Sequence, residues 1–267
     1  MTQAAASIGD HLREWRQRRR LSQMDLALDA EISTRHLSFL ETGRARPSRD
    51  MVLRLAERLE VPLRERNVLL VAAGFAPVFS ERRLDDPALA PARAAVDLVL
   101  KGHEPYPAVA IDRHWTLIAS NAAVPPLLAG VDPDLLEPPV NVLRLSLHPN
   151  GLAPRIENLA EWRAHLLARL RHQIELTADA LLVELMNDLR ALPGSREVVP
   201  SGPDYGGVVV PMRLKTPAGT LQLFSTTTVF GTPVDVTLSE LAIEAFYPAD
   251  AGTGVALRDL LAGAGSR

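Results

Sequence analysis

The clearest chemical signal in the sequence is a group of polar side chains interleaved with apolar ones at helical spacing. Leu37 and Leu40 fit the inner face of a helix and leave its other face to polar residues. The residues on that outer face are Ser33, Thr34, Arg35 and Ser38. Arginine can donate paired hydrogen bonds to guanine, hydroxyls can reach bases or phosphates, and a helix fits the roughly 12 Å major groove. The spacing therefore predicts a helix that reads DNA.

Other polar residues are placed to hold the DNA backbone. Gln23 begins the preceding predicted helix, whose positive end favours a phosphate. Arg44 and Arg46 lie in the loop after the predicted reading helix. Arg16 or Arg19, on the arginine-rich first helix, is a further candidate. We expect these side chains to contact phosphates on the two sides of the groove.

Five short helices are predicted to position these residues within 1–74. Ser22, with Asp25 three residues on, is typical of a helix start, and Ser48 is placed to begin a later helix. The small Ala27 allows two helices to cross closely. The fold expected for residues 1–74 is an all-α helix-turn-helix domain.

The segment QMDLALDAEISTRHLSFLETGRARPS, residues 23–48, resembles the XRE family, whose prototypes are the phage repressors and Cro. The resemblance rests on the SQ start, the alanine four residues later and the closing LETGRARPS, and extends over about residues 8–70. It departs at the turn, where Glu31 stands in a position that glycine often fills. A non-glycine residue in a left-handed turn costs on the order of 1 kcal/mol, which a domain tolerates.

The charge balance changes along the chain. Residues 1–72 hold 13 arginines and 10 acidic residues, a net charge of +3, whereas the rest holds 16 basic and 22 acidic residues, a net charge of −6. This division predicts a polyanion partner for the first part only. The Pro-containing, aperiodic stretch 75–91 is expected to be the linker.

Several classes of protein are excluded by composition. The chain has no cysteine, which excludes disulfides, thiol catalysis and cysteine-bound metals. The apolar runs are shorter than the roughly 20 residues that span a bilayer, and no secretory signal is apparent, so a cytoplasmic protein without membrane association is expected.

Residues 92–267 are expected to form an α+β domain. A helix at 92–100 and a hairpin over 109–119 come first, and helices at 157–174 and 177–192 follow an irregular, Pro-rich region at 125–154. Strands are predicted at 207–215, 219–230 and 236–247. Two strands, then helices, then three strands indicate a PAS-like domain with a five-stranded antiparallel sheet.

Residues 141–167 and 216–250 resemble the MmyB-like ligand-binding domain, found behind DNA-binding domains chiefly in actinomycete regulators. This resemblance extends over about residues 92–262, and the family is similar to PAS domains. It implies a bound fatty acid or another amphipathic molecule, and no other cofactor is expected. An acyl ligand needs apolar walls and a polar anchor. The candidate ligand contacts are the walls Trp115, Phe224 and Phe230 and the anchors Arg144 and His148.

Signals for an enzyme are weak. His165 and His172 are seven residues apart, about 10.5 Å along a helix, too far to share a metal. The motifs HExxH, GxSxG and Walker A do not occur. We therefore expect no catalytic residue and no metal site.

The leading hypothesis is a sequence-specific transcription regulator that binds a pseudo-palindromic operator as a homodimer and senses a small apolar or amphipathic ligand, in particular a fatty acid. One alternative is a DNA-binding adaptor whose PAS-like domain serves only dimerisation or protein contacts. Another is an enzyme fused to a DNA-binding domain, which requires a cluster of titratable groups in the cavity.

Overall fold

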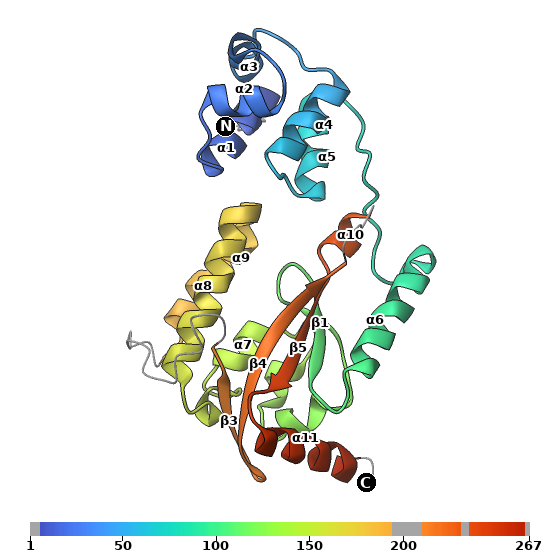
Figure 1. Cartoon of the computed structure of the whole chain (residues 1–267), viewed down its shortest axis with the longest axis vertical. Coiled ribbons are helices and arrows are strands. Elements are labelled where there is room, and N and C mark those ends of the chain that lie inside the picture. Colours follow the sequence, from blue (N-terminus) through green and yellow to red (C-terminus); the bar gives the residue numbers. More distant parts are fainter. Residues whose placement is uncertain (1–5, 194–209, 231–234, 265–267) are drawn as a thin grey trace. The chain divides into compact units, whose positions relative to one another are not determined.

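A computed structural model describes residues 6–193, 210–230 and 235–264, and divides the chain into two compact units (Figure 1). The boundary lies between Arg82 and Arg83, and two short later segments that end at Thr177 and Ser239 group with the first unit. This boundary falls inside the stretch 75–91 that the sequence predicts as the linker. The last residues of that stretch already form a 3-10 turn, η1 (Pro87–Leu89), and the start of a helix.

The described part of the first unit contains the five predicted helices. They are α1 (Ile8–Arg18), α2 (Gln23–Asp29), α3 (Thr34–Glu41), α4 (Arg49–Arg58) and α5 (Leu63–Ala72). A serine caps each of the first four, because its hydroxyl accepts the backbone N–H three residues on. Ser7 and Ser22 form complete capping boxes with Asp10 and Asp25. These caps explain why four short helices begin where they do.

The helix-turn-helix geometry depends on small residues and a strained turn. Glu31 follows α2 with φ of 55°, so the turn is left-handed as predicted even though the residue is not glycine. Ala27 is buried where α2 meets α3. Gly9 lies so close to the end of α3 that an added Cβ would be 2.7 Å from the carbonyl oxygens of Leu40 and Glu41. The three helices are therefore held by close backbone contact as well as by apolar packing.

The second unit is built on a five-stranded antiparallel sheet in the order β2-β1-β5-β4-β3. The strands are β1 (Ala108–Ile111), β2 (Leu117–Ser120), β3 (Met212–Thr216), β4 (Gly219–Val229) and β5 (Ala242–Pro248). The fold class is thus the predicted one, a helical domain followed by an α+β domain with this sheet.

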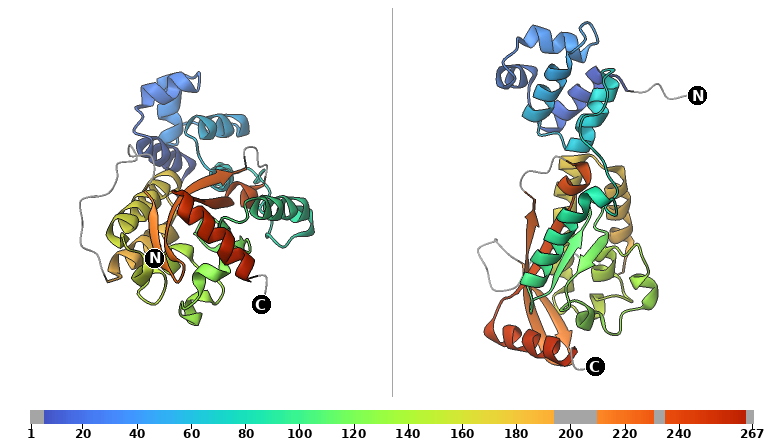
Figure 2. Two further views of the ribbon diagram at one scale, coloured as in Figure 1. Left: turned by 60° about the horizontal axis from the view of Figure 1, so that its bottom comes forward. Right: turned by 90° about the vertical axis from the view of Figure 1, so that its right-hand side faces the viewer.

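Helices cover both faces of the sheet (Figure 2). On one face α6 (Ala90–Gly102) packs Val96 and Leu100 against β1 and β5. The other face lies under α8 (Leu159–Thr177) and α9 (Ala180–Ala191), and the larger apolar core fills the space between them. The short α7 (Val142–Leu147) borders the same core, and α11 (Ala251–Ala264) packs against β4 and β5.

The structure corrects several predicted boundaries. The predicted strand 236–247 begins as the short helix α10 (Val236–Ser239), and the strand starts only at Ala242. The region 125–154 contains α7 and the 3-10 turns η2 (Pro125–Leu128), η3 (Pro133–Leu136) and η4 (Ala153–Arg155), where prolines at the first positions favour helical turns. The strand predicted at 207–215 is observed from Met212, and residues 207–209 lie outside the described residues.

Candidate DNA interface and ligand cavity

The start of α3 carries the side chains predicted to read DNA. Thr34 and Arg35 are exposed, and Ser38 is half-buried. The Arg35 guanidinium lies 5.3 Å from the centre of the Phe39 ring, which holds its stem along the helix. Ser33 is the N-cap, and its hydroxyl accepts the N–H of His36 at 3.1 Å. The exposed face of α3 is thus as predicted, but one of its hydroxyls already serves the helix.

A buried carboxylate connects α3 to the two helices before it. Glu41, at the end of α3, has no exposed side-chain surface. Its oxygens accept hydrogen bonds from Arg16 at 2.7 and 2.9 Å and from the amide of Gln23 at 2.8 Å, and Arg13 lies 3.7 Å away. Arg16 therefore lies in a buried ion pair rather than on the surface where the sequence places it. Gln23 begins α2 as predicted, with its amide held by Glu41.

Two opposing effects set the pKa of Glu41. Burial disfavours the charged carboxylate, which raises its pKa, but the hydrogen bonds from Arg16 and Gln23 and the nearby arginine charges outweigh burial. The pKa of Glu41 consequently lies below its usual value. The hydrogen bonds between Arg16 and Glu41 outweigh burial in turn and raise the pKa of Arg16. The pair stays ionised and holds α1, α2 and α3 in one arrangement.

The remaining predicted phosphate contacts differ in their surroundings. Arg44 and Arg46 are exposed in the loop after α3, and the Arg44 guanidinium lies 5.9 Å from the centre of the Phe39 ring. Arg19 instead donates hydrogen bonds to the carbonyls of Leu59 and Glu60, at the end of α4. Arg44 and Arg46 are available to a ligand, whereas Arg19 connects two helices of its own domain.

The second unit contains a partly open apolar cavity of about 110 Å³ between the sheet and α7 and α8. Its walls come from strand residues such as Val109 and Leu223 and from helix residues such as Leu143, Trp162 and Leu166. Ser146 also lines it, and its hydroxyl accepts the Trp162 indole N–H at 2.9 Å. The arrangement is that of a small-molecule site with mainly apolar walls and a few polar groups.

The charged residues among the described lining are Arg169 and Glu244. Arg169 projects from α8 and donates to both oxygens of Glu244 on β5, at 3.0 and 2.5 Å. Thr227 on β4 donates to Glu244 at 2.6 Å and accepts from Arg169 at 2.8 Å. The guanidinium also lies 5.0 Å from the centre of the Trp115 ring. The polar end of the cavity is therefore a paired cluster rather than a single exposed charge.

Trp115 is held by both its backbone and its ring. It lies in the β1–β2 turn with φ of 66°, a strained conformation for a bulky residue. Its indole N–H donates to the side-chain oxygen of Gln173 at 2.7 Å, and the Gln173 amide donates to the Arg113 carbonyl at 2.7 Å. One wall of the cavity is thus fixed to the β1–β2 turn.

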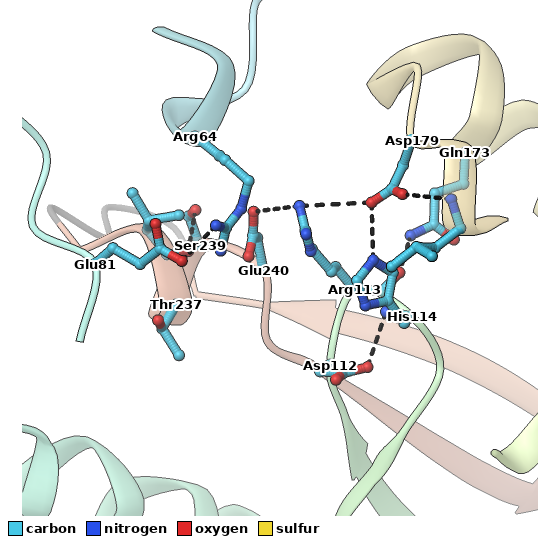
Figure 3. Close-up of polar contacts among 12 residues, drawn as sticks. Arg64, Glu81, Asp112, Arg113, His114, Gln173, Asp179, Thr237, Ser239 and Glu240 are labelled. Atoms are coloured by element: carbon cyan, nitrogen blue, oxygen red, sulfur yellow. Dashed lines mark hydrogen bonds and ion pairs between the residues drawn. The ribbon is translucent and has the colours of Figure 1, made fainter. Parts of the chain in front are cut away.

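The same turn is fixed to the start of α9 by charged side chains (Figure 3). Asp179, the N-cap of α9, lies 2.9 Å from His114 Nε2 and 3.5 Å from Arg113. Burial raises the pKa of Asp179. The hydrogen bonds from His114 and the Leu181 backbone, together with the nearby positive charges, lower it by more, so the pKa lies below its usual value. The loop that carries Trp115 is consequently anchored on two sides.

Of the five residues that the sequence predicts as ligand contacts, Trp115 lines this cavity. Phe224 points to the opposite face of β4, because side chains alternate along a strand, and stacks on Tyr247 at 5.4 Å. Phe230 packs with the α6 side of the sheet. Arg144 is exposed on α7 and paired with Asp188, and His148 caps the end of α7. These four residues lie away from the cavity lining.

The sequence reasoning missed the polar pair inside the cavity. Arg169 and Glu244 are 75 residues apart, so their contact depends on how α8 crosses the sheet. The available signal was Glu244 itself, an acidic residue within the apolar strand AIEAFYP. A charge at a buried strand position requires a partner, and that requirement points to a functional or structural ion pair.

Comparison with protein families assigns the two units. A family model described as the MmyB-like transcription regulator ligand binding domain matches residues 92–260, more than half of the chain. The chain belongs to this family. A helix-turn-helix domain model matches residues 7–69. This MmyB-like chain therefore joins a DNA-binding domain to a ligand-binding domain, and both matched families are domains of transcription regulators.

Other comparisons add little to this assignment. The search of curated proteins finds no match. One solved structure, "Structure of an RNA-binding Light-Oxygen-Voltage Receptor", is 15% identical with a TM-score of 0.26, and the match covers 99% of the MmyB-like chain. The chain spans 65% of the length of that protein, and the low TM-score carries no argument about function. In the part that the structure describes, helices fall short of the length and apolarity needed to cross a membrane.

Proposed function

We propose that this regulator acts in the cytoplasm as a homodimer on a pseudo-palindromic operator, and that a small apolar or amphipathic ligand changes its affinity for DNA. The observation that carries the proposal is the exposed start of α3, where Thr34 and Arg35 face outward on a helix fixed by Ser33 and Glu41. Arg44 and Arg46 in the following loop supply backbone contacts.

A homodimer follows from the small size of one reading module. A single helix contacts few base pairs, whereas two copies place their reading helices about 34 Å apart, one turn of DNA. The ligand acts by favouring one dimer geometry, and its effect on DNA affinity can be no larger than its difference in affinity for the two geometries. A fatty acid is one candidate within the proposed ligand class. The role we propose is non-enzymatic.

The first experiment identifies the operator and tests the reading residue. Genomic fragments that the purified full-length protein retains are sequenced, and the shared site is used in a fluorescence anisotropy titration. Arg35→Ala is expected to weaken binding by about 1–3 kcal/mol, the loss typical of a base contact, without loss of fold. Arg171→Ala, an exposed arginine on α8, is the matched control and is expected to bind like the natural protein. Unchanged operator binding by Arg35→Ala contradicts the assignment of α3.

The second experiment tests ligand sensing. The protein is denatured, and released small molecules are identified by mass spectrometry and added back during the operator titration. A molecule that shifts DNA affinity supports the proposal. A protein that releases nothing and binds no added lipid or aromatic compound is instead the adaptor, whose second domain serves only dimerisation or protein contacts.

A further inference from the structure

The polar end of the cavity already neutralises its own charges. Glu244 stands between Val109 on β1 and Thr227 on β4 in the register of the sheet, and its side chain is 5% exposed. Arg169 reaches it from α8, so the pair joins the two layers that border the cavity. With both Glu244 oxygens bonded to Arg169 and one also bonded to Thr227, the cluster carries no net charge.

This pairing discriminates against charged ligands. A carboxylate that binds Arg169 either displaces Glu244, which leaves a buried glutamate without its partner, or places a second negative charge beside Glu244. Both arrangements are costly in an apolar cavity. An ammonium group meets the same obstacle at Glu244. An alcohol, amide or similar neutral group can donate to or accept from the cluster while the ion pair stays intact. Ser146 and Ser225 offer further hydroxyls in the lining.

The size of the cavity sets a second limit. Pockets for drug-sized ligands measure about 300–1,000 Å³, whereas an apolar cavity of about 150 Å³ holds a benzene molecule. At about 110 Å³ this cavity matches one small ring or a short chain. The flat indole of Trp115 and the Trp162 ring in the lining suit such a molecule.

We infer that the cavity binds a small, uncharged, mainly apolar molecule about the size of a single ring, with its polar group toward Arg169 and Glu244, and that this ion pair excludes carboxylates. The inference rests on the proposed function that the domain senses a ligand, and it narrows the ligand class. Glu244 is the residue that sets specificity for neutral molecules.

The test uses the full-length protein and probes that differ in charge or length. Binding of benzyl alcohol, benzoate and decanoate is measured at pH 7 by isothermal titration calorimetry. Benzyl alcohol is expected to bind at least tenfold more tightly than benzoate, because benzoate either disrupts the ion pair or adds a negative charge beside Glu244. Leu166→Phe, which fills the cavity from α8, is expected to abolish benzyl alcohol binding.

The variant Glu244→Gln tests the role of the ion pair directly. It keeps the shape of the side chain but frees the Arg169 charge, so benzoate affinity is expected to rise at least tenfold, the gain of about one charge-assisted hydrogen bond. Benzyl alcohol affinity is expected to change by a smaller factor than benzoate affinity, so the preference for the alcohol over the carboxylate falls. Glu184→Gln, an exposed site on α9, is the control and leaves both affinities unchanged. If Glu244→Gln does not fold by circular dichroism, the ratio of the two affinities in the natural protein still decides.

Four outcomes overturn the inference. The first is that benzoate binds the natural protein as tightly as benzyl alcohol or more tightly, and the second is that Glu244→Gln does not bind benzoate more tightly. Binding of decanoate without benzyl alcohol refutes the ligand class while ligand sensing stands. If no probe binds, the inference fails, and the sensing function is then decided separately by whether the denatured protein releases a bound molecule.

Discussion

Replacing Glu41 by glutamine is the most informative change in the DNA-binding unit. The variant keeps the size of the side chain but removes the charge that faces Arg16, Gln23 and Arg13. The new amide oxygen can accept one hydrogen bond from Arg16, and the amide NH₂ then opposes the other guanidinium donor. Arg16, 12% exposed, is left as a buried cation without a counter-charge.

The expected loss of stability can be estimated from this geometry. Removing one partner of a buried ion pair costs about 3–5 kcal/mol. Arg16 retains a hydrogen bond to the Leu21 carbonyl at 2.9 Å, so we expect a value near the lower end, about 3 kcal/mol. At roughly 0.05–0.15 kcal/mol per residue, residues 7–72 have on the order of 3–10 kcal/mol of stability. Glu41→Gln is therefore expected to remove a third or more of it.

Hydrogen exchange with mass spectrometry measures this loss in the full-length protein. Peptides from α1 to α3 report the free energy of opening, and peptides from β4 and β5 serve as the internal reference. The double variant Arg16→Met with Glu41→Leu is expected to recover much of the loss, because no buried charge remains. A change below about 1 kcal/mol in Glu41→Gln refutes the view that this pair holds the three helices together.

Three further predictions concern the two units. Gly9→Ala is expected to destabilise the first unit by about 1–3 kcal/mol in urea unfolding, because its Cβ meets backbone carbonyls at 2.7 Å, whereas Gly102→Ala has open space and should be neutral or stabilising. Because the pKa of Glu41 in the folded protein lies below its usual 4.5, the carboxylate contributes its full stabilisation above about pH 4.5 and loses it as pH falls through the folded pKa. An acid titration followed by circular dichroism should show this loss of stability, and the loss should be smaller in Glu41→Gln. Asn121→Ala is expected to destabilise the second unit by about 1–3 kcal/mol in thermal unfolding. The Asn121 side chain accepts a hydrogen bond from the Ala108 N–H and donates to the carbonyls of Leu100 and Tyr106. An equal loss in the exposed control Asn187→Ala would contradict this expectation.

The first unit could be predicted closely because its signals are local. Serine caps, a left-handed turn at Glu31 and apolar spacing around Leu37 each act within a few residues. The ion pair of Arg16 could not be predicted in this way, because its partner Glu41 lies 25 residues away in the sequence. The residues that line the cavity were hard to predict for the same reason, because they come from segments that lie far apart in the sequence. Which side of β4 Phe224 faces, and whether Arg169 meets Glu244, depend on strand register and on how α8 crosses the sheet.

In the proposed function, the short exposed face of α3 limits how much sequence information one copy can carry. With the Ser33 hydroxyl occupied by the helix backbone, Thr34, Arg35 and Ser38 remain on a helix of 8 residues. A face that reads roughly three or four base pairs is matched by chance about once in 64 to 256 positions, whereas a genome offers on the order of 10⁶ or more. One copy alone would thus match thousands of equivalent sites in a genome. In the proposed homodimer the chances for the two faces multiply, and the distance between them has to fit as well. A ligand that altered this distance would then weaken or strengthen binding to a site of fixed spacing without touching a base.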